Sequence, residues 1–213
     1  MILINNLYLK YIREYYALYD INLKIKEGES VAFLGEVESG KTSLIRILAK
    51  VEKYSKGEVY IKNIPLRKIN YATDINLGYL PATPVFLENK TVYENLLYIL
   101  KTQKVKKSER ENKINNILIE FNFESLKDTK IKQLSLFEKY LISFARLSFR
   151  KLEIVLIDDI FEKLNEEQSE IIKELIKKLY VGKSTLILAT QNEKIAKELC
   201  KREIYFKSGS IEE

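Results

Sequence analysis

The stretch GEVESGKTS, residues 35–43, has the spacing of a phosphate-binding loop. Gly35 and Gly40 let the backbone turn tightly and point amide hydrogens inward, which forms an anion nest at the start of a helix. The ammonium of Lys41 would reach the β- and γ-phosphates of a nucleotide, and the hydroxyl of Thr42 would ligate Mg²⁺. A buried strand before the loop and an amphipathic helix after it are the context that this motif requires. These residues therefore predict a nucleotide site.

Two carboxylates, those of Glu36 and Glu38, stand inside this loop. A carboxylate about 6 Å from a phosphate charge would cost roughly 3 kcal/mol at an effective dielectric constant of 20, if it faced inward. A side chain that faces solvent would escape most of this penalty through screening. The loop therefore raises the question of whether the chain hydrolyses a nucleotide or only holds it.

A second carboxylate for the site is expected from a buried strand near the loop. The run IVLIDD, residues 154–159, is an apolar strand that ends in Asp158 and is followed by Asp159. We expect Asp158 to hold Mg²⁺ through water, because this is the arrangement at the second motif of phosphate-loop enzymes.

Three short apolar runs have the length and β-branched content of strands that are covered on both faces in a parallel sheet. They are SVAFLG at 30–35, IVLID at 154–158 and TLILAT at 185–190. Helical spacing of apolar residues occurs in three further places. The residues are Leu44, Ile47, Leu48 and Val51; Ile114, Ile117, Leu118 and Phe121; and Ile171, Ile172, Leu175, Ile176 and Leu179. Alternating strands and helices predict an α/β fold with right-handed crossovers.

Two parts of the chain depart from this alternation. Residues 1–35 and 57–64 have the pattern of short strands with turns and predict a β-rich N-terminal flank, whereas residues 91–145 have a helical pattern throughout. Thr91 with Glu94, and Ser108 with Glu111, have the spacing of capping boxes at the heads of two helices. We expect one domain over residues 1–213, with an α/β core in 1–84 and 146–213 and an inserted helical subdomain in 85–145.

The composition is that of a globular protein. The 213 residues are 46% hydrophobic and 31% charged, with a net charge of +6, which is enough chain to bury one substantial core. The weak, scattered basic charge argues against a nucleic-acid track, so no nucleic-acid partner is expected. A single cysteine, Cys200, excludes an internal disulfide. The start MILINNLYLK lacks the order of a signal peptide, and no apolar run approaches the roughly 18 residues of a membrane span. A soluble, cytoplasmic protein is expected.

With both motifs placed, the chain resembles the ATP-binding cassette (ABC) family of transporter ATPases nearly end to end. Five segments carry the resemblance in the family's order: ALYDINLKIKEGESVAFLGEVESGKTSLIRILA, LGYLPATPVFLENKTVYENLLYIL, IKQLSLFEKYLISFARL, EIVLIDDIF and TLILATQNEKI. The stretches NKTVYENLLYIL and LATQNEKIAKELCKREIYF are most similar to the cell-division and lipoprotein-release branches. The resemblance implies a P-loop NTPase core with a mainly parallel sheet.

The family's pattern also implies partners and ligands. Two such subunits pair head to tail, as a homodimer or a heterodimer, and each ATP with its Mg²⁺ lies between one subunit's phosphate loop and the other's signature, here marked by Ser135. An aromatic residue before the first core strand stacks on adenine; Tyr11 fits best by spacing, and Tyr15 and Tyr16 are alternatives. The implied cofactor contacts are Tyr11, Gly35, Glu36, Val37, Glu38, Ser39, Gly40, Lys41, Thr42, Ser43 and Ser135, with Thr42 and Asp158 at the metal.

Several positions that the family uses for hydrolysis are substituted. Ala82 stands where a glutamine would touch Mg²⁺ and the attacking water. The family's general-base glutamate is Asp159, one methylene shorter, and its switch histidine is Gln191 in a chain without any histidine. The signature reads LSLFE, so Leu136 and Phe137 replace glycines whose bare backbone lets a phosphate approach. Asn165 replaces an aspartate of the loop after the second motif.

Some of these positions have structural explanations as well. Ser135 with Glu138, Asn165 with Gln168, and Thr190 with Glu193 all have the spacing of a helix cap. Loss of one oriented polar group at an active site can lower a rate by about 10²–10³, and positioning of charge and water is nearly all of phosphoryl-transfer catalysis. The residues expected to bind ATP and Mg²⁺ are therefore kept, whereas most of the residues expected to cleave ATP are substituted.

We therefore expect an ATP-binding subunit that is peripheral on the inner face of the cell membrane. It would couple dimer closure to an integral-membrane permease-type partner, and its own hydrolysis of ATP would be weak or absent. One alternative is a competent ATPase that uses Asp159 as its base, with Gln191 in the place of the histidine. Another is a soluble regulatory ABC protein. Proteins of that kind usually carry tandem cassettes or long coiled-coil insertions, and this sequence shows neither.

Overall fold

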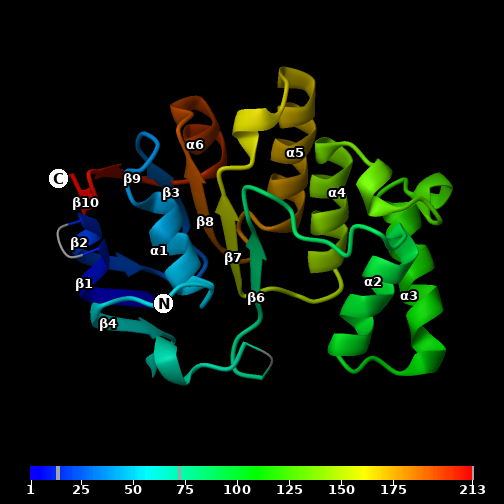
Figure 1. Ribbon diagram of the computed structural model, residues 1–213, viewed down its shortest axis with the longest axis horizontal. Helices are drawn as coiled ribbons and strands as arrows, with labels where there is room; N and C mark the ends of the chain where they lie inside the picture. Colours follow the sequence, from blue (N-terminus) through cyan, green and yellow to red (C-terminus); the bar gives the residue numbers. More distant parts are fainter. Residues whose placement is uncertain (13–14, 72, 213) are drawn as a thin grey trace. The chain divides into compact units, whose positions relative to one another are not determined.

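The computed structural model describes residues 1–12, 15–71 and 73–212. Contacts between residues divide the chain into two compact units, one formed by residues 1–82 and 152–213 and the other by residues 83–151. The first unit contains both sheets, and the second is helical (Figure 1). Within the described residues, no helix is both long enough and apolar enough to cross a lipid bilayer.

A six-stranded sheet forms the centre of the first unit, in the order β10-β9-β3-β8-β7-β6. Its strands are β3 (Ser30–Leu34), β6 (Leu77–Leu80), β7 (Ile154–Asp158), β8 (Thr185–Thr190), β9 (Arg202–Lys207) and β10 (Ser210–Ile211). All neighbouring pairs are parallel except β9 with β10. Every residue of β3, β7 and β8 is buried, which confirms the three strands predicted from continuous apolar runs.

The N-terminal flank is a four-stranded antiparallel sheet in the order β2-β1-β4-β5. Its strands are β1 (Ile2–Ile12), β2 (Tyr15–Ile25), β4 (Lys56–Ile61) and β5 (Ile64–Pro65). The β-rich flank is thus confirmed, but the expectation of short strands is wrong for β1 and β2, each of which has 11 residues. Irregular register between these two strands lets the ribbon twist without ending, so turn-forming residues such as Asn6 and Asp20 lie inside it.

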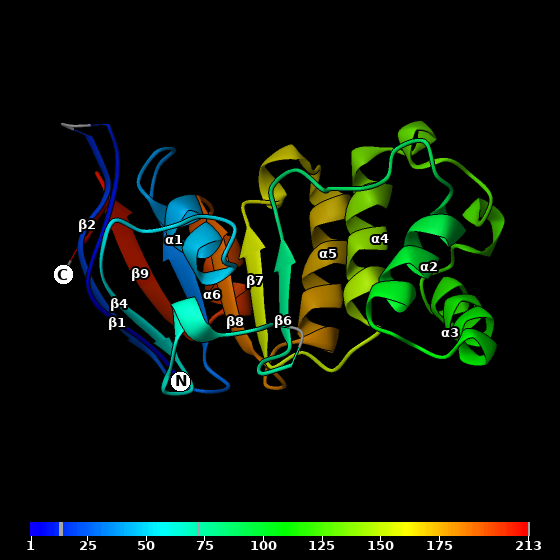
Figure 2. The same ribbon diagram turned by 60° about the horizontal axis from the view of Figure 1, so that its bottom comes forward.

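Three helices pack on the parallel sheet. Helix α1 (Lys41–Leu48) contacts β2, β7 and β8, while α6 (Glu193–Leu199) contacts β3, β8 and β9, and α5 (Glu166–Leu179) lies beside α6 on the opposite face from α1 (Figures 1 and 2). Helix α1 is shorter than its apolar spacing predicted: it ends at Leu48, and Val51 is exposed, as is Ile171 of α5. The core between the two sheets contains Leu44, Ile45, Ile47 and Leu48 of α1.

The helical unit consists of α2 (Val92–Thr102), α3 (Lys107–Glu120) and α4 (Leu136–Leu147), with short 3₁₀ turns between α3 and α4. Its own core gathers Val92, Leu96, Leu100, Ile114, Leu118 and Ile142. Buried Asn95 ties the entry loop to α2, because its side chain accepts from the amide of Leu87 and donates to the carbonyl of Thr91.

Three of the predicted helix caps are confirmed and two are wrong. Capping boxes are present at Thr91–Glu94, Ser135–Glu138 and Asn165–Gln168. Helix α3 instead begins at Lys107 after Lys106, so Ser108 already lies inside its first turn. Thr190 ends β8, and Asn192 caps α6 by accepting the amide of Ile195.

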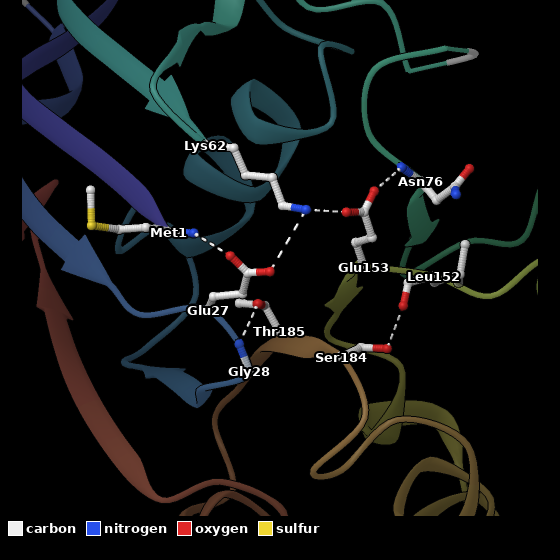
Figure 3. A network of polar contacts seen from close by, with 9 residues as sticks. All are labelled: Met1, Glu27, Gly28, Lys62, Asn76, Leu152, Glu153, Ser184 and Thr185. Atoms are coloured by element: carbon white, nitrogen blue, oxygen red, sulfur yellow. Dashed lines mark hydrogen bonds and ion pairs between the residues drawn. The ribbon is translucent and has the colours of Figure 1, made fainter.

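An ionic network lies at the amino ends of the parallel strands (Figure 3). Lys62, in the turn between β4 and β5, forms ion pairs with Glu153 just before β7 and with Glu27 just before β3. The carboxylate of Glu153 also accepts the amide of Asn76 at 2.9 Å. Hydrogen bonds from Lys62 and from the Asn76 amide lower the pKa of Glu153. The network thereby links the antiparallel sheet to the amino ends of β3, β6 and β7 in the parallel sheet.

Replacing Lys62 by methionine is expected to lower the free energy of unfolding by about 1 kcal/mol near neutral pH, since both partners of the Lys62–Glu153 pair are about one-third exposed. The pKa of Glu153 is lower in the folded chain than in the unfolded chain. Its contribution is therefore present above the unfolded pKa and is lost as the pH falls through the folded one. Urea unfolding at pH 7 and pH 3 should show the difference between wild type and variant shrinking in acid. Exposed Lys53→Met is the matched control, and an equal loss in that variant would contradict the assignment.

Candidate nucleotide-binding site

The phosphate loop joins β3 to α1, and its two predicted glycines are required by close approaches of the backbone. A Cβ on Gly35, whose φ is 147°, would lie 2.2 Å from the carbonyl oxygen of Phe206 in β9. A Cβ on Gly40, whose φ is 106°, would lie 2.8 Å from the carbonyl oxygen of Ala17 in β2. The loop is also held from the β9–β10 turn, where the amide of Gly209 donates to the carbonyl of Ser39 at 3.0 Å.

Lys41 is the first residue of α1, and its ammonium is held within the phosphate loop. The side chain is 3% exposed. Its Nζ donates to the carbonyl oxygens of Gly35 and Glu36, both at 2.7 Å, and to Ser39 Oγ at 3.1 Å. Burial lowers the pKa of Lys41, and the carboxylates of Asp159, Asp158 and Glu162 oppose this shift. A positive charge is therefore positioned beside the amide-rich start of the helix, where an anion is stabilised.

The hydroxyl of Thr42 donates to Asp158 Oδ1 at 2.8 Å. This bond joins the first turn of α1 to the last residue of β7. Asp158 is 1% exposed, and its other oxygen accepts the hydroxyl of Tyr79 in β6 at 3.4 Å. Burial raises the pKa of Asp158, while the hydrogen bond from Thr42 lowers it. The structure thus brings together the two residues expected at the metal.

A cavity of about 330 Å³ opens over this loop. Its lining contains most of the predicted contacts together with two residues that were not predicted, Ala17 and Glu162. The lining residues are Tyr11, Tyr15, Ala17, Val37, Glu38, Ser39, Gly40, Lys41, Thr42, Ser43, Asp159 and Glu162. Glu36, Val37 and Glu38 are all exposed, so solvent screens the two loop carboxylates, and Glu36 is outside the lining.

Two of the three candidate tyrosines line this cavity. The hydroxyl of Tyr11 lies 3.3 Å from Ser43 Oγ, and both Tyr11 and Tyr15 are about half exposed. Tyr16 packs differently, because its ring lies edge-on to those of Tyr8 and Tyr19, with Lys10 Nζ 4.8 Å from its centre. The geometry therefore narrows the candidates for base stacking to Tyr11 and Tyr15.

Asp159 follows Asp158 in a left-handed conformation with φ of 50°, and its amide donates to the carbonyl of Ala189. Its side chain lines the cavity, and Oδ1 is buried without a hydrogen-bond partner among the described residues. Burial, together with the nearby charge of Glu162, raises the pKa of Asp159 to about 6. A buried acceptor of this kind suits a bound water or ligand.

Glu162 is the residue that sequence reasoning missed. It lies in a 3₁₀ turn over Phe161–Lys163, lines the cavity, and accepts a hydrogen bond from the side-chain amide of Gln191. Gln191 itself is exposed just after β8 and does not line the cavity. The sequence did contain a signal for it, namely a carboxylate three residues after Asp159. Residues three apart in a 3₁₀ turn lie on the same side of the turn, so Glu162 could have been expected on the side of Asp159.

Three further predicted positions, Ala82, Ser135 and Asn165, do not line the cavity. Ala82 follows β6, next to β7, at the same edge of the sheet as Asp158. Ser135 lies in the helical unit, where its hydroxyl accepts the amide of Glu138, and it is not part of the cavity lining. Asn165 caps α5.

The cavity has the chemistry of a site for a phosphate with a hard cation. A buried ammonium and a helix start can bind an anion, while the Thr42 hydroxyl and the Asp158 carboxylate are oxygen ligands of the kind that Mg²⁺ prefers. Asp159 Oδ1, which has no hydrogen-bond partner among the described residues, is a further oxygen that could accept a hydrogen bond from a bound water or ligand.

Comparison with known proteins agrees with this chemistry. The chain is 32% identical over 191 residues to the lipoprotein-releasing system ATP-binding protein LolD of Francisella tularensis, covering 86% of this chain and 83% of that protein. It is 29% identical over 215 residues to the sulfate/thiosulfate import ATP-binding protein CysA of Mesostigma viride, of whose length it spans 61%.

A solved dimer of the ATP-binding cassette MJ0796, in a post-hydrolysis state with ADP and Pi, superposes with a TM-score of 0.87. It is 28% identical, and the match covers 100% of this chain and 97% of that one. The family model described as ABC transporter matches residues 18–162, which include the phosphate loop, Asp158 and Asp159. The chain belongs to the ABC transporter family.

Proposed function

We propose that this chain is the ATP-binding subunit of an ABC-type membrane complex, with Mg²⁺-ATP bound at the phosphate loop. The observation that carries the proposal is the assembled loop: buried Lys41 beside the helix start, and Thr42 bonded to Asp158. In this reading, Lys41 holds the terminal phosphates, and Thr42 and Asp158 hold Mg²⁺, which would neutralise phosphate charge. Tyr11 or Tyr15 would stack on the base.

The partners are proposed from the relatives. LolD and CysA are named as ATP-binding proteins of a releasing system and of an import process, and MJ0796 forms a dimer. By analogy, this chain would pair with itself or with a second ATPase subunit, with Ser135 facing the partner's nucleotide. Closure of that dimer would drive an integral-membrane subunit, and the complex would place this chain at the cytoplasmic face of the membrane.

We further propose that hydrolysis is weak or absent. Gln191 stands at the switch position and is already bonded to Glu162. Ala82 offers only a methyl group at the position expected to orient the attacking water. Positioning of water and charge supplies nearly all of the catalysis in this reaction class, so their loss affects cleavage more than binding.

A competent ATPase that uses Asp159 as its base is the second candidate, and one observation favours it. Asp159 lines the cavity with an oxygen that has no hydrogen-bond partner within the described part of the chain, and a pKa of about 6 leaves the carboxyl mostly ionised at neutral pH. A base whose pKa lies near the operating pH is effective in proton transfer.

Steady-state phosphate release from Mg²⁺-ATP separates the two candidates. We expect the purified chain to bind Mg²⁺-ATP and Lys41→Ala to weaken binding about 10- to 100-fold, because charge-assisted hydrogen bonds to phosphate are lost. Phosphate release should equal that of the Lys41→Ala blank. Exposed Lys53→Ala is the control for general loss of charge. Release clearly above the blank would reject the proposal of weak or absent hydrolysis and make Asp159 the residue to test next, and absence of nucleotide binding would reject the proposed site.

The double change Asp159→Glu with Gln191→His should raise phosphate release about tenfold or more over its starting level. The two changes restore reach towards the water and place an imidazole at the switch position, and one oriented group is worth about 10²–10³ in rate. The control is Asp159→Glu with Gln191→Asn, which keeps an amide at the switch position. A double variant that stays at the level of the blank would contradict the idea that these two positions limit hydrolysis.

A further inference from the structure

Glu162 brings a carboxylate to the candidate nucleotide cavity in addition to that of Asp159, which follows β7. It lies in the turn that follows Asp159, and both side chains line the cavity. Its charge raises the pKa of Asp159 and opposes the fall in the pKa of Lys41, and all three residues line the same cavity. Lys41 and Thr42 mark the place of the terminal phosphates. Glu162 is therefore on the terminal-phosphate side of the cavity.

The carboxylate of Glu162 is held in position from a neighbouring strand. Gln191 Nε2 donates to Glu162 Oε1, and this bond spans the loops that follow β7 and β8. These strands are adjacent and parallel, with Asp158 paired to Ala189. The amide of Asp159 adds a second link by donating to the carbonyl of Ala189. The two loops thus support each other, and the Glu162 side chain has a fixed partner although it is exposed.

Among the described residues, the charges at the cavity are unbalanced. Lys41 is the cationic side chain of the lining, whereas Asp159, Glu162 and Glu38 contribute carboxylates, and the charge of Asp158 also acts on Lys41. A third phosphate adds negative charge on the side nearest Glu162. Repulsion between like charges falls with distance, so it acts more on a γ-phosphate than on the α- and β-phosphates.

We propose that Glu162, positioned by Gln191, is a specificity-determining residue that lowers the preference of the site for nucleoside triphosphate over diphosphate. This inference rests on the proposed function of the cavity as a nucleotide site. Occupancy by triphosphate would then depend on the ratio of ATP to ADP rather than on ATP alone, since the diphosphate competes effectively.

Isothermal titration with Mg²⁺-ATP and Mg²⁺-ADP tests the inference in the full chain. Glu162→Gln removes the charge, while its amide oxygen can still accept from Gln191. We expect this variant to bind Mg²⁺-ATP about tenfold more tightly, with Mg²⁺-ADP changed by less than about threefold. Glu166→Gln, an equal change of charge at an exposed position in the first turn of α5, should alter neither affinity.

Gln191→Ala separates position from charge. It keeps the carboxylate but frees it to turn into solvent, so Mg²⁺-ATP should again bind more tightly, by a smaller factor. The inference is overturned if Glu162→Gln changes both nucleotides equally or neither, or if Glu166→Gln reproduces its effect. An unchanged affinity ratio in Gln191→Ala removes the positioning role.

Failure of the inference differs from failure of the proposed function. If the wild type binds Mg²⁺-ATP and Glu162→Gln leaves the ratio unchanged, only the inference falls. If Glu162→Gln binds Mg²⁺-ATP and the wild type binds only Mg²⁺-ADP, the inference stands and the proposed ATP-binding role falls. Absence of binding in every variant overturns both.

Discussion

The hydrogen bond between Thr42 and Asp158 joins two segments that are far apart in the sequence, and the geometry of the site depends on it. It is possible because β3 and β7 run parallel with β8 between them, so their carboxyl ends meet at one edge of the sheet. Asp158 is buried at that edge, and a buried carboxylate needs a donor. Asp159, the turn with Glu162 and the start of α1 are all placed relative to this pair.

The balance of charge in the cavity bears on which ligands it can bind. Among the residues that the structure describes, Lys41 is the one cation in the lining, and nearby carboxylates favour its charged form against the effect of burial. A polyanion can enter such a site only with a cation that offsets these carboxylates, which fits the oxygen ligands of Thr42 and Asp158. In the proposed function, Lys41, Thr42 and Asp158 would recognise the phosphates and Mg²⁺, whereas the substitutions at Ala82 and Gln191 fall on positions expected to act on the attacking water.

Local patterns in the sequence predicted the parts of this structure that local chemistry determines. The phosphate loop, three buried strands and three capping boxes could each be recognised from residues that are close together in the sequence. Where the outcome depended on longer-range packing, the predictions failed. Strand lengths in β1 and β2 follow from register with a partner strand, and the cap at Thr190 gave way to the end of β8. The Glu162–Gln191 pair was missed for the same reason, since its members follow two different strands.

The close contact between Gly35 and Phe206 also bears on the order in which the site forms during synthesis. The loop at 35–43 emerges early, but β9 and the Gly209 turn that support it come from the last part of the printed sequence. Until those residues have paired with β3, the loop lacks one wall and the bond from Gly209 to Ser39. A nascent chain that has made only its phosphate loop therefore does not yet have a formed nucleotide site. In the proposed function, the nucleotide site would form only after β9 and the Gly209 turn have been synthesised and β9 has paired with β3.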